Sequence, residues 1–173
     1  LTDPDYVHKL EKGEAHRIRH CMMCNKGCTD AIQNRKFLSC VLNAENGYEY
    51  ERVITPAITK KKVVIVGGGP AGMEAARVAR LKGHDVVLFE KETTLGGQLN
   101  IACIPRKSEM TRGIHYLTNE MKELNVDLRL GKEACANCIM EENPDHVIIA
   151  VGAYNIVPPI DGSKQPHVLD AWK

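Results

Sequence analysis

The chain has 173 residues, of which 43% are hydrophobic and 26% are charged, and these values are ordinary for a globular protein. Its formal net charge of +1 gives no reason to expect binding to nucleic acid or to an anionic membrane surface. No apolar stretch approaches the roughly 20 residues that a membrane span needs, and the first residues lack the basic and apolar regions of a signal peptide. We therefore expect a cytoplasmic protein, and the absence of an initiator Met suggests a piece of a longer chain.

The first 60 residues show no sign of a regular core. The Asp3–Pro4 pair predicts the start of a short helix that runs toward Lys12. A cysteine-rich segment follows over residues 21–40. Residues 41–60 hold several turn-forming residues and little hydrophobic periodicity, so we interpret them as a linker that wraps around the molecule.

Four of the seven cysteines form the pattern Cys-x2-Cys-x3-Cys-x11-Cys, at Cys21, Cys24, Cys28 and Cys40. Without a secretion signal, clustered cysteines indicate metal ligands rather than disulfides. Four thiolates suit either a tetrahedral zinc ion or a 4Fe–4S cluster. Three close cysteines and a fourth farther along favour the cluster, and zinc stays an alternative. Gly27 is expected to supply the unusual backbone angles of such a tight loop.

Cys135 and Cys138 form a second Cys-x2-Cys pattern. No βαβ pattern of the thioredoxin kind surrounds them, so we interpret the pair as structural, on a short helix after Ala134. Cys103, beside Ile104 and Pro105, is expected to contribute to packing.

From Lys62 onward the pattern predicts an α/β fold with a parallel sheet. Val63–Val66 is a continuous apolar run, as expected for a strand buried on both faces. A glycine cluster follows, and a helical pattern from Met73 to Leu81 ends before Gly83. Asp85–Phe89 then predicts a second strand, which completes a unit of the size of one βαβ element.

The remainder of the chain continues this alternation. Residues 107–124 predict a helix with one apolar face. Val126–Leu130 alternates apolar and polar residues and predicts a half-exposed strand. His146–Val151 predicts another buried strand, which ends at Gly152.

The glycine cluster Gly67–Gly72 fits the pattern G-x-G-x-x-G between a predicted strand and a predicted helix. In this context Gly67 permits the tight turn, Gly69 lets the backbone approach a pyrophosphate, and Gly72 lets the helix pack close to the sheet. The phosphates are expected at the helix N-terminus, where free N–H groups favour anions. Glu90 ends the second strand and is expected to bind a ribose hydroxyl, which disfavours a 2′-phosphate.

Together these residues resemble the iron–sulfur flavoproteins related to 2,4-dienoyl-CoA reductase, enoate reductase and trimethylamine dehydrogenase, within the wider group of NADH:flavin oxidoreductases related to Old yellow enzyme. Leu1–Asp5 is similar to the exit from that family's flavin-binding β/α barrel, and Ile18–Cys40 is similar to its cluster segment. The motifs of its FAD-binding domain follow in order at Gly67–Gly72, Gly96–Leu99, Pro105 with Lys107, and Ala150–Gly152.

The resemblance implies three parts for this chain. Residues 1–20 would be a helical tail from the end of a missing β/α barrel, and residues 21–60 the four-cysteine iron–sulfur segment and linker. Residues 61–173 would be the first part of a Rossmann-like FAD/NAD(P)-binding domain. The barrel, the NAD(P)H domain normally inserted near Trp172 and Lys173, and the returning half of the FAD domain would lie elsewhere in the parent chain. The fragment alone is therefore expected to be inactive.

The resemblance also implies a circuit for electrons. NAD(P)H would reduce FAD by hydride transfer, and single electrons would pass through a 4Fe–4S cluster to FMN, which would reduce an activated carbon–carbon double bond of an enoate or enoyl-CoA. In amine-oxidising relatives the electrons leave FMN through the cluster, and ADP takes the place of FAD. An amine-dehydrogenase-like or electron-carrier module holding ADP, and a zinc-stabilised nucleotide-binding adaptor, are the alternatives.

Carried over by motif, the resemblance assigns the cluster to Cys21, Cys24, Cys28 and Cys40, and assigns no catalytic residue to this chain. Ala71 would meet the pyrophosphate, Glu90 the ribose, and the backbone of Ala134 the adenine. Gln98 and Lys107 would contact the flavin nucleotide, with a turn cap and a solvated helix start as their respective alternatives. The expected cofactor-binding residues are Gly67, Gly69, Pro70, Ala71, Gly72, Glu90, Lys91, Gly97, Gln98, Leu99, Lys107, Ala134, Ala150 and Gly152.

Overall fold

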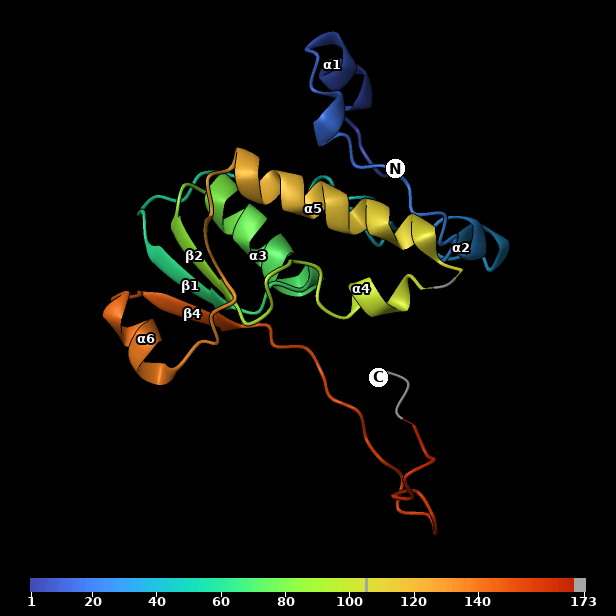
Figure 1. Cartoon of the computed structure of the whole chain (residues 1–173). Helices are drawn as coiled ribbons and strands as arrows, with labels where there is room; N and C mark the ends of the chain where they lie inside the picture. The colour runs from blue at the N-terminus through green and yellow to red at the C-terminus, as the bar shows by residue number, and fades with distance from the viewer. Residues whose placement is uncertain (105, 170–173) are drawn as a thin grey trace.

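The computed structural model describes residues 1–104 and 106–169. Figure 1 shows a sheet with two long helices along one face, an N-terminal segment beside the outer of these helices, and a C-terminal segment that extends away from the sheet. The expectations for Pro105, Trp172 and Lys173 lie outside the described residues.

The sheet has four parallel strands in the order β3-β2-β1-β4. The strands are β1 (Lys62–Val66), β2 (Asp85–Glu90), β3 (Asp127–Leu130) and β4 (His146–Ile149). The two central strands, β1 and β2, are buried along most of their length. The parallel pairing and the burial of these two strands confirm the α/β fold that their continuous apolar runs predicted.

The helices α3 (Pro70–Leu81) and α5 (Thr111–Glu123) cover one face of the sheet (Figure 1). Alternate residues of β1 and β2, such as Val63 and Leu88, join a buried core with side chains from both helices. The other face, around Phe89, packs against Ala134 and Ile139, which bracket the start of the short helix α6 (Ala136–Glu141). The predicted helix over residues 107–124 corresponds to the 3-10 turn η2 (Ser108–Met110) and α5.

The prediction that His146–Val151 is a buried strand is wrong. The structure forms β4 over His146–Ile149 only, and all four of its residues are exposed, with Ile149 at 73%. The reason is its place in the sheet, because β4 pairs with β1 on one side and lies at the edge. An apolar sequence allows burial of a strand, but a neighbouring element has to supply the cover.

The remaining helices of the described chain are short. They are α1 (Tyr6–Glu11), the 3-10 turn η1 (Ala15–Arg17), α2 (Thr29–Gln33) and α4 (Leu99–Ala102). The helix α1 lies where Asp3–Pro4 predicted it. No helix in residues 1–104 and 106–169 is long and apolar enough to cross a membrane.

The N-terminal segment is attached to α5 by contacts along one side of that helix. The contacts are His16 Nε2 with Glu123 Oε1 at 3.1 Å, Arg17 Nε to Glu120 Oε1 at 3.1 Å, Arg19 Nη2 to the Tyr116 hydroxyl at 3.1 Å, Asn119 Nδ2 to the His16 carbonyl at 3.1 Å, and Arg112 Nη1 to the Cys21 carbonyl at 2.8 Å. The helix therefore joins the cysteine-rich segment to the α/β domain.

Candidate nucleotide and cluster sites

The glycine turn connects the end of β1 to the start of α3. Gly67 has a φ of 110° and donates its N–H to the Phe89 carbonyl at 2.8 Å. A β-carbon on Gly67 would collide with the Ala150 carbonyl, and one on Gly72 would collide with the Gly67 carbonyl. The turn and the close helix–sheet packing therefore require glycine at both positions, as the sequence predicts.

Gly69 is different, because a β-carbon added there would meet no atom within 4 Å. The space above it borders the N-terminus of α3, where Pro70 is the first helical residue. The first intrahelical hydrogen bond runs from Met73 N–H to the Gly69 carbonyl at 2.9 Å, so the N–H groups of Ala71 and Gly72 precede it. An open approach to free N–H groups is what a phosphate needs.

Glu90 closes the turn from the end of β2. Its side chain is buried, and its Oε2 accepts the N–H of Gly68 at 2.6 Å while its Oε1 accepts the N–H of Glu92 at 2.8 Å. A carboxylate oxygen has a second lone pair, so either oxygen can still accept a hydroxyl. Glu90 therefore fixes the turn and keeps the capacity to bind a ribose.

A second glycine loop lies against the first. Gly96 donates its N–H to the Gly68 carbonyl at 2.9 Å, and a β-carbon on Gly97 would lie 3.1 Å from the Gly69 α-carbon. Gln98 Nε2 donates to the Ala153 carbonyl at 2.9 Å, which ties this loop to the exit from β4 beside Gly152. This contact joins segments 55 residues apart and is not a local turn cap, and a contact between Gln98 and a flavin nucleotide stays a prediction.

The other expected nucleotide-binding residues lie in the segments that follow β2, β3 and β4 and in the loop around α4. Lys132 N–H, two residues before Ala134, donates to the Glu90 carbonyl at 3.0 Å, and Ala150 N–H donates to the Val66 carbonyl at 2.8 Å. Lys91 is exposed just after β2, and Leu99 begins α4. The exposed side chain of Lys107 makes no hydrogen bond or ion pair with the described part of the chain.

Sequence reasoning missed two parts of this edge of the sheet. Gly68 is buried, and a β-carbon there would lie 2.6 Å from Leu95 Cδ2 and 2.9 Å from Glu90 Oε2. Lys132 Nζ lies 5.6 Å from the centre of the Phe89 ring. The run of three consecutive glycines, in which Gly68 is the middle one, was the sequence signal for the close packing at Gly68. Nothing in the sequence pattern singled out Lys132.

The four predicted cluster cysteines lie in two short stretches that the backbone holds together. Ser39 N–H donates to the Gly27 carbonyl at 2.8 Å, which places the stretch that carries Cys40 next to the one that carries Cys28. All four thiols are free. Their donor set suits a thiolate-ligated centre, but within residues 1–104 and 106–169 no three Cys, His, Asp or Glu side chains converge as metal ligands.

The interpretation of Gly27 is corrected by the structure. The positive backbone angles of the loop belong to Met23, with a φ of 56°, and Asn25, with a φ of 54°. Gly27 serves instead for close approach, because a β-carbon there would lie 2.6 Å from Ser39 Oγ and 2.8 Å from the Ser39 carbonyl carbon.

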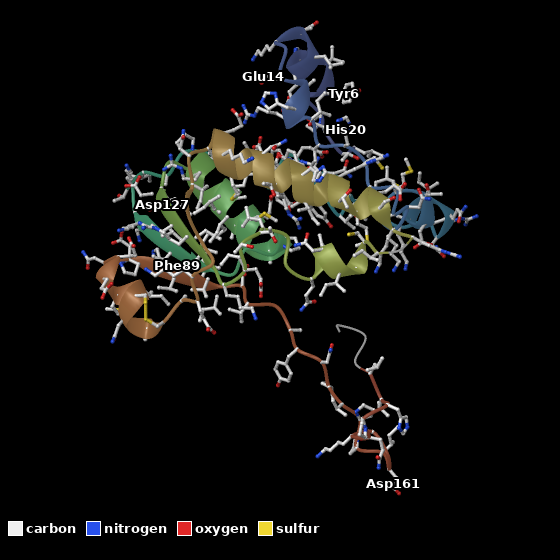
Figure 2. All side chains as sticks on the ribbon, viewed as in Figure 1. Tyr6, Glu14, His20, Phe89, Asp127 and Asp161 are labelled. Atoms are coloured by element: carbon white, nitrogen blue, oxygen red, sulfur yellow. A yellow bond between two sulfur atoms is a disulfide. The ribbon has the colours of Figure 1, made fainter. Side chains whose placement is uncertain are left out.

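Cys135 and Cys138 are joined by a disulfide at the start of α6 (Figure 2). The position on a short helix is as expected, whereas the covalent link was not anticipated. Cys103 stays a free thiol, and its Sγ donates to the Asn100 carbonyl at 3.2 Å.

Comparison with known proteins agrees with this geometry. Residues 61–172 match the family described as pyridine nucleotide-disulphide oxidoreductase. The chain is 78% identical, over all of its length and 27% of the relative, to a bilirubin reductase of Mediterraneibacter gnavus. It is 35% identical to a cinnamate reductase of Clostridium sporogenes, over 96% of this chain and 25% of that protein.

A solved structure also covers nearly the whole chain. The 2-naphthoyl-CoA reductase in complex with 2-naphthoyl-CoA superposes with a TM-score of 0.95 at 34% identity, over 99% of this chain and 26% of that one. This chain thus spans about a quarter of the length of the relatives that it matches. It belongs to the pyridine nucleotide-disulphide oxidoreductase family and, with these relatives, to the flavoenzymes related to 2,4-dienoyl-CoA reductase and trimethylamine dehydrogenase.

Proposed function

We propose that this chain is the nucleotide-binding and electron-relay region of an NAD(P)H-dependent flavin oxidoreductase. The observation that carries the proposal is the open surface above Gly69, which is bordered by the α3 N-terminus and by the buried Glu90 carboxylate. Its geometry suits the pyrophosphate and ribose of FAD.

The residues at the carboxyl ends of the strands would each contact a different part of FAD. The N–H groups of Ala71 and Gly72 would face the pyrophosphate, Glu90 would accept a ribose hydroxyl, and the segment at Ala134 would border the adenine. Gly97, Gln98 and Lys107 would lie along the flavin side. The further expected members of the site are Gly67, Pro70, Lys91, Leu99, Ala150 and Gly152.

The four cysteines would hold a 4Fe–4S cluster, since their thiols are free and their two stretches are joined at Gly27 and Ser39. Loading would draw the thiols together from their present positions. When held by these residues, FAD would supply a hydride acceptor for NAD(P)H, and the cluster would supply a carrier of single electrons toward FMN in a separate barrel. In this proposal residues 1–20 lead out of that barrel, residues 21–60 hold the cluster, and residues 61–173 bind FAD.

The whole protein would reduce an activated carbon–carbon double bond. Support comes from the relatives, which include reductases of bilirubin, cinnamate and 2-naphthoyl-CoA. Because the bilirubin reductase shares 78% identity with this chain, bilirubin is the first substrate to test.

The test uses the full-length protein that contains this chain, purified without oxygen. Mass spectrometry of the released nucleotide should find FAD, metal analysis should find iron, and NAD(P)H should be oxidised when bilirubin is added. ADP in place of FAD would favour the electron-carrier alternative. Zinc without iron would contradict the cluster, and absence of any adenine nucleotide would contradict the proposed site.

A matched pair of variants tests the cysteine assignment. Cys24→Ser removes one proposed ligand from the loop and should lower the iron content and the broad visible absorption of the protein. Cys103→Ser changes a free thiol outside the pattern and should leave both unchanged. Equal iron content in the two variants would count against the assignment.

A further inference from the structure

The Cys135–Cys138 pair is set apart from the other cysteines. It forms a disulfide with a Cα–Cα separation of 5.1 Å, within the range that a disulfide can bridge. The other five cysteines of the chain are free thiols. Cys135 is exposed and Cys138 is half-buried, so small solutes can reach the pair.

The two residues are also linked by a hydrogen bond. Cys138 N–H donates to Cys135 Sγ at 3.1 Å. The same contact would favour a thiolate on Cys135 after reduction, because a backbone N–H stabilises negative charge on sulfur. A short loop of two residues keeps the second sulfur close, so closure of the disulfide is an intramolecular step.

The pair connects directly to the proposed nucleotide edge. Ala134 precedes Cys135, and it packs with Ile139 against the buried cluster around Phe89. Upstream, Lys132 N–H donates to the Glu90 carbonyl at 3.0 Å, and Gly131 N–H donates to the Glu92 carbonyl at 2.8 Å. The segment that carries the disulfide is therefore hydrogen-bonded, only three residues before Cys135, to the backbone of Glu90.

We propose that Cys135 and Cys138 form a reversible dithiol–disulfide site that controls how tightly this edge holds an adenine nucleotide. The inference rests on the proposed function of the glycine turn. The disulfide closes a ring over residues 135–138 and restricts the backbone that borders the adenine. The nucleotide then orders less of the protein when it binds, so the disulfide form binds more tightly.

The chemistry is thiol–disulfide exchange with a low-molecular-weight disulfide. Cys135 loses its proton, and its thiolate attacks that disulfide, forms a mixed disulfide and releases one small thiolate, which takes up the proton that Cys135 lost. The Cys138 sulfur then displaces the second small thiol, which takes up the proton that Cys138 loses. The protein loses two S–H bonds and gains one S–S bond, while the small disulfide gains two electrons and becomes two thiols.

The experiment equilibrates the full-length holoprotein without oxygen in buffers of different ratios of reduced to oxidised glutathione. Alkylation followed by peptide mass spectrometry reports the state of each thiol. Cys135 and Cys138 should pass together from two alkylated thiols to none as the buffer becomes oxidising. Persistence of both alkylated thiols at the most oxidising ratio, or a mixed disulfide with glutathione as the end product, would overturn the exchange.

Ultrafiltration of the same samples measures the dissociation constant of the bound adenine nucleotide. It should be about fivefold larger in the dithiol form, at the low end of ordinary coupling between two sites. Equal values in the two forms would overturn the coupling. If denatured holoprotein releases no adenine nucleotide, the proposed function fails and the coupling fails with it, whereas the alkylation result still decides the exchange.

Two variants complete the test. Cys135→Ser keeps an oxygen that can accept the Cys138 N–H, so the fold of α6 should persist while the dependence on glutathione disappears. Cys103→Ser should retain the full dependence. A fivefold response that survives in Cys135→Ser would show that another group is responsible and would refute the assignment to this pair.

Discussion

At the scale of single residues, Glu90 holds the glycine turn and is the residue proposed to bind the ribose. Its buried carboxylate accepts N–H groups from both Gly68 and Glu92, and in the proposed complex it also faces the ribose. A change of this side chain should therefore affect both the stability of the turn and the affinity for the nucleotide.

Glu90→Gln tests this double role. Its NH2 group would face one of the two N–H donors, which then lacks an acceptor, and this costs about 1–3 kcal/mol of unfolding free energy. Adenine nucleotide affinity should fall by about tenfold or more, as measured by ultrafiltration alongside chemical denaturation. Glu92→Gln, an exposed change two residues away, should alter stability by less than about 0.5 kcal/mol. Wild-type behaviour of Glu90→Gln would show that the carboxylate has neither task.

The sequence predicted the position of Glu90 but not its contacts. An acid at the end of the second strand follows from the spacing of the motif. Its bonds to Gly68 and Glu92 depend on the rotamer of a buried side chain and on the path of the next loop. The positive φ angles of Met23 and Asn25 were likewise not predicted, although Asn adopts such angles more readily than most residues.

At the scale of elements, two glycines of the turn from β1 to α3 differ in role. Gly72 is required by close packing, and Gly69 is the glycine proposed to admit the pyrophosphate. Gly72 lies against the Gly67 carbonyl, whereas Gly69 faces open space. One glycine is tightly packed and the other is open, so the same substitution to Ala at both positions makes a matched pair.

Gly69→Ala should leave stability unchanged or slightly higher, because Gly69 has an ordinary φ of −74° and its β-carbon meets nothing. It should nevertheless weaken nucleotide binding, since the methyl group occupies the approach to the pyrophosphate. Gly72→Ala should instead lower the unfolding free energy by about 1–3 kcal/mol through overpacking. Thermal unfolding and nucleotide titration of both variants check this, and a Gly69→Ala protein with full affinity would argue against a pyrophosphate there.

The N-terminal segment depends on a second buried carboxylate. Asp3 Oδ2 accepts Lys9 Nζ and the Arg19 N–H, each at 2.7 Å. Burial alone raises the pKa of Asp3, but the hydrogen bonds from Arg19 and Lys9 outweigh it, so the pKa lies below its ordinary value. The contribution of Asp3 to stability is thus complete above the pKa of the unfolded chain and is lost as pH falls through the lower folded pKa.

Asp3→Asn should destabilise the segment at pH 7 by about 1–3 kcal/mol, because it removes a charged partner of Lys9. The difference from wild type should begin to shrink as pH falls below the ordinary pKa of an Asp, 3.8, and should disappear as pH falls through the lower pKa of the folded wild type. Hydrogen exchange of residues 1–20 as a function of pH measures both effects. Asp5→Asn, an exposed change in the same turn, serves as the control, and a difference that persists at low pH would be inconsistent with this role.

The sequence predicted most elements of the α/β domain because period and glycine spacing are local properties. It failed for the burial of β4, since an apolar run looks alike in a central strand and in an edge strand. It also treated Cys135 and Cys138 as a structural pair without their disulfide, because bonding depends on how α6 packs.

At the scale of the whole molecule, β4 and the segment after it present apolar side chains to solvent. Ile149, Val151, Tyr154 and Ile156 are all more than two-thirds exposed. An apolar surface of this kind on a parallel sheet indicates a further layer of protein. We expect that layer to come from the rest of the full-length protein, of which this chain matches about a quarter in its relatives.

Ile149→Thr distinguishes the chain from the full-length protein. In residues 1–173 alone the change should alter the unfolding free energy by less than about 0.5 kcal/mol, because the side chain is already exposed. In the full-length protein it should cost about 1–3 kcal/mol. Ile58→Thr, at a fully exposed linker position, should be neutral in both. Chemical denaturation of both variants and of wild type, each as residues 1–173 and as the full-length protein, measures these effects. A neutral Ile149→Thr in the full-length protein would show that no further layer covers β4.

The attachment of the cysteine-rich segment along α5 has a mechanical consequence. Arg17 and Arg19 bind Glu120 and Tyr116 of this helix, while Leu117 and Met121, together with Tyr116 itself, anchor it in the core. In the proposed relay, this helix, rather than residues 41–60, would therefore set the distance that an electron has to tunnel between the cysteine loop and the glycine turn. Extra residues inserted at the exposed Tyr50 would lengthen the tether without lengthening that path.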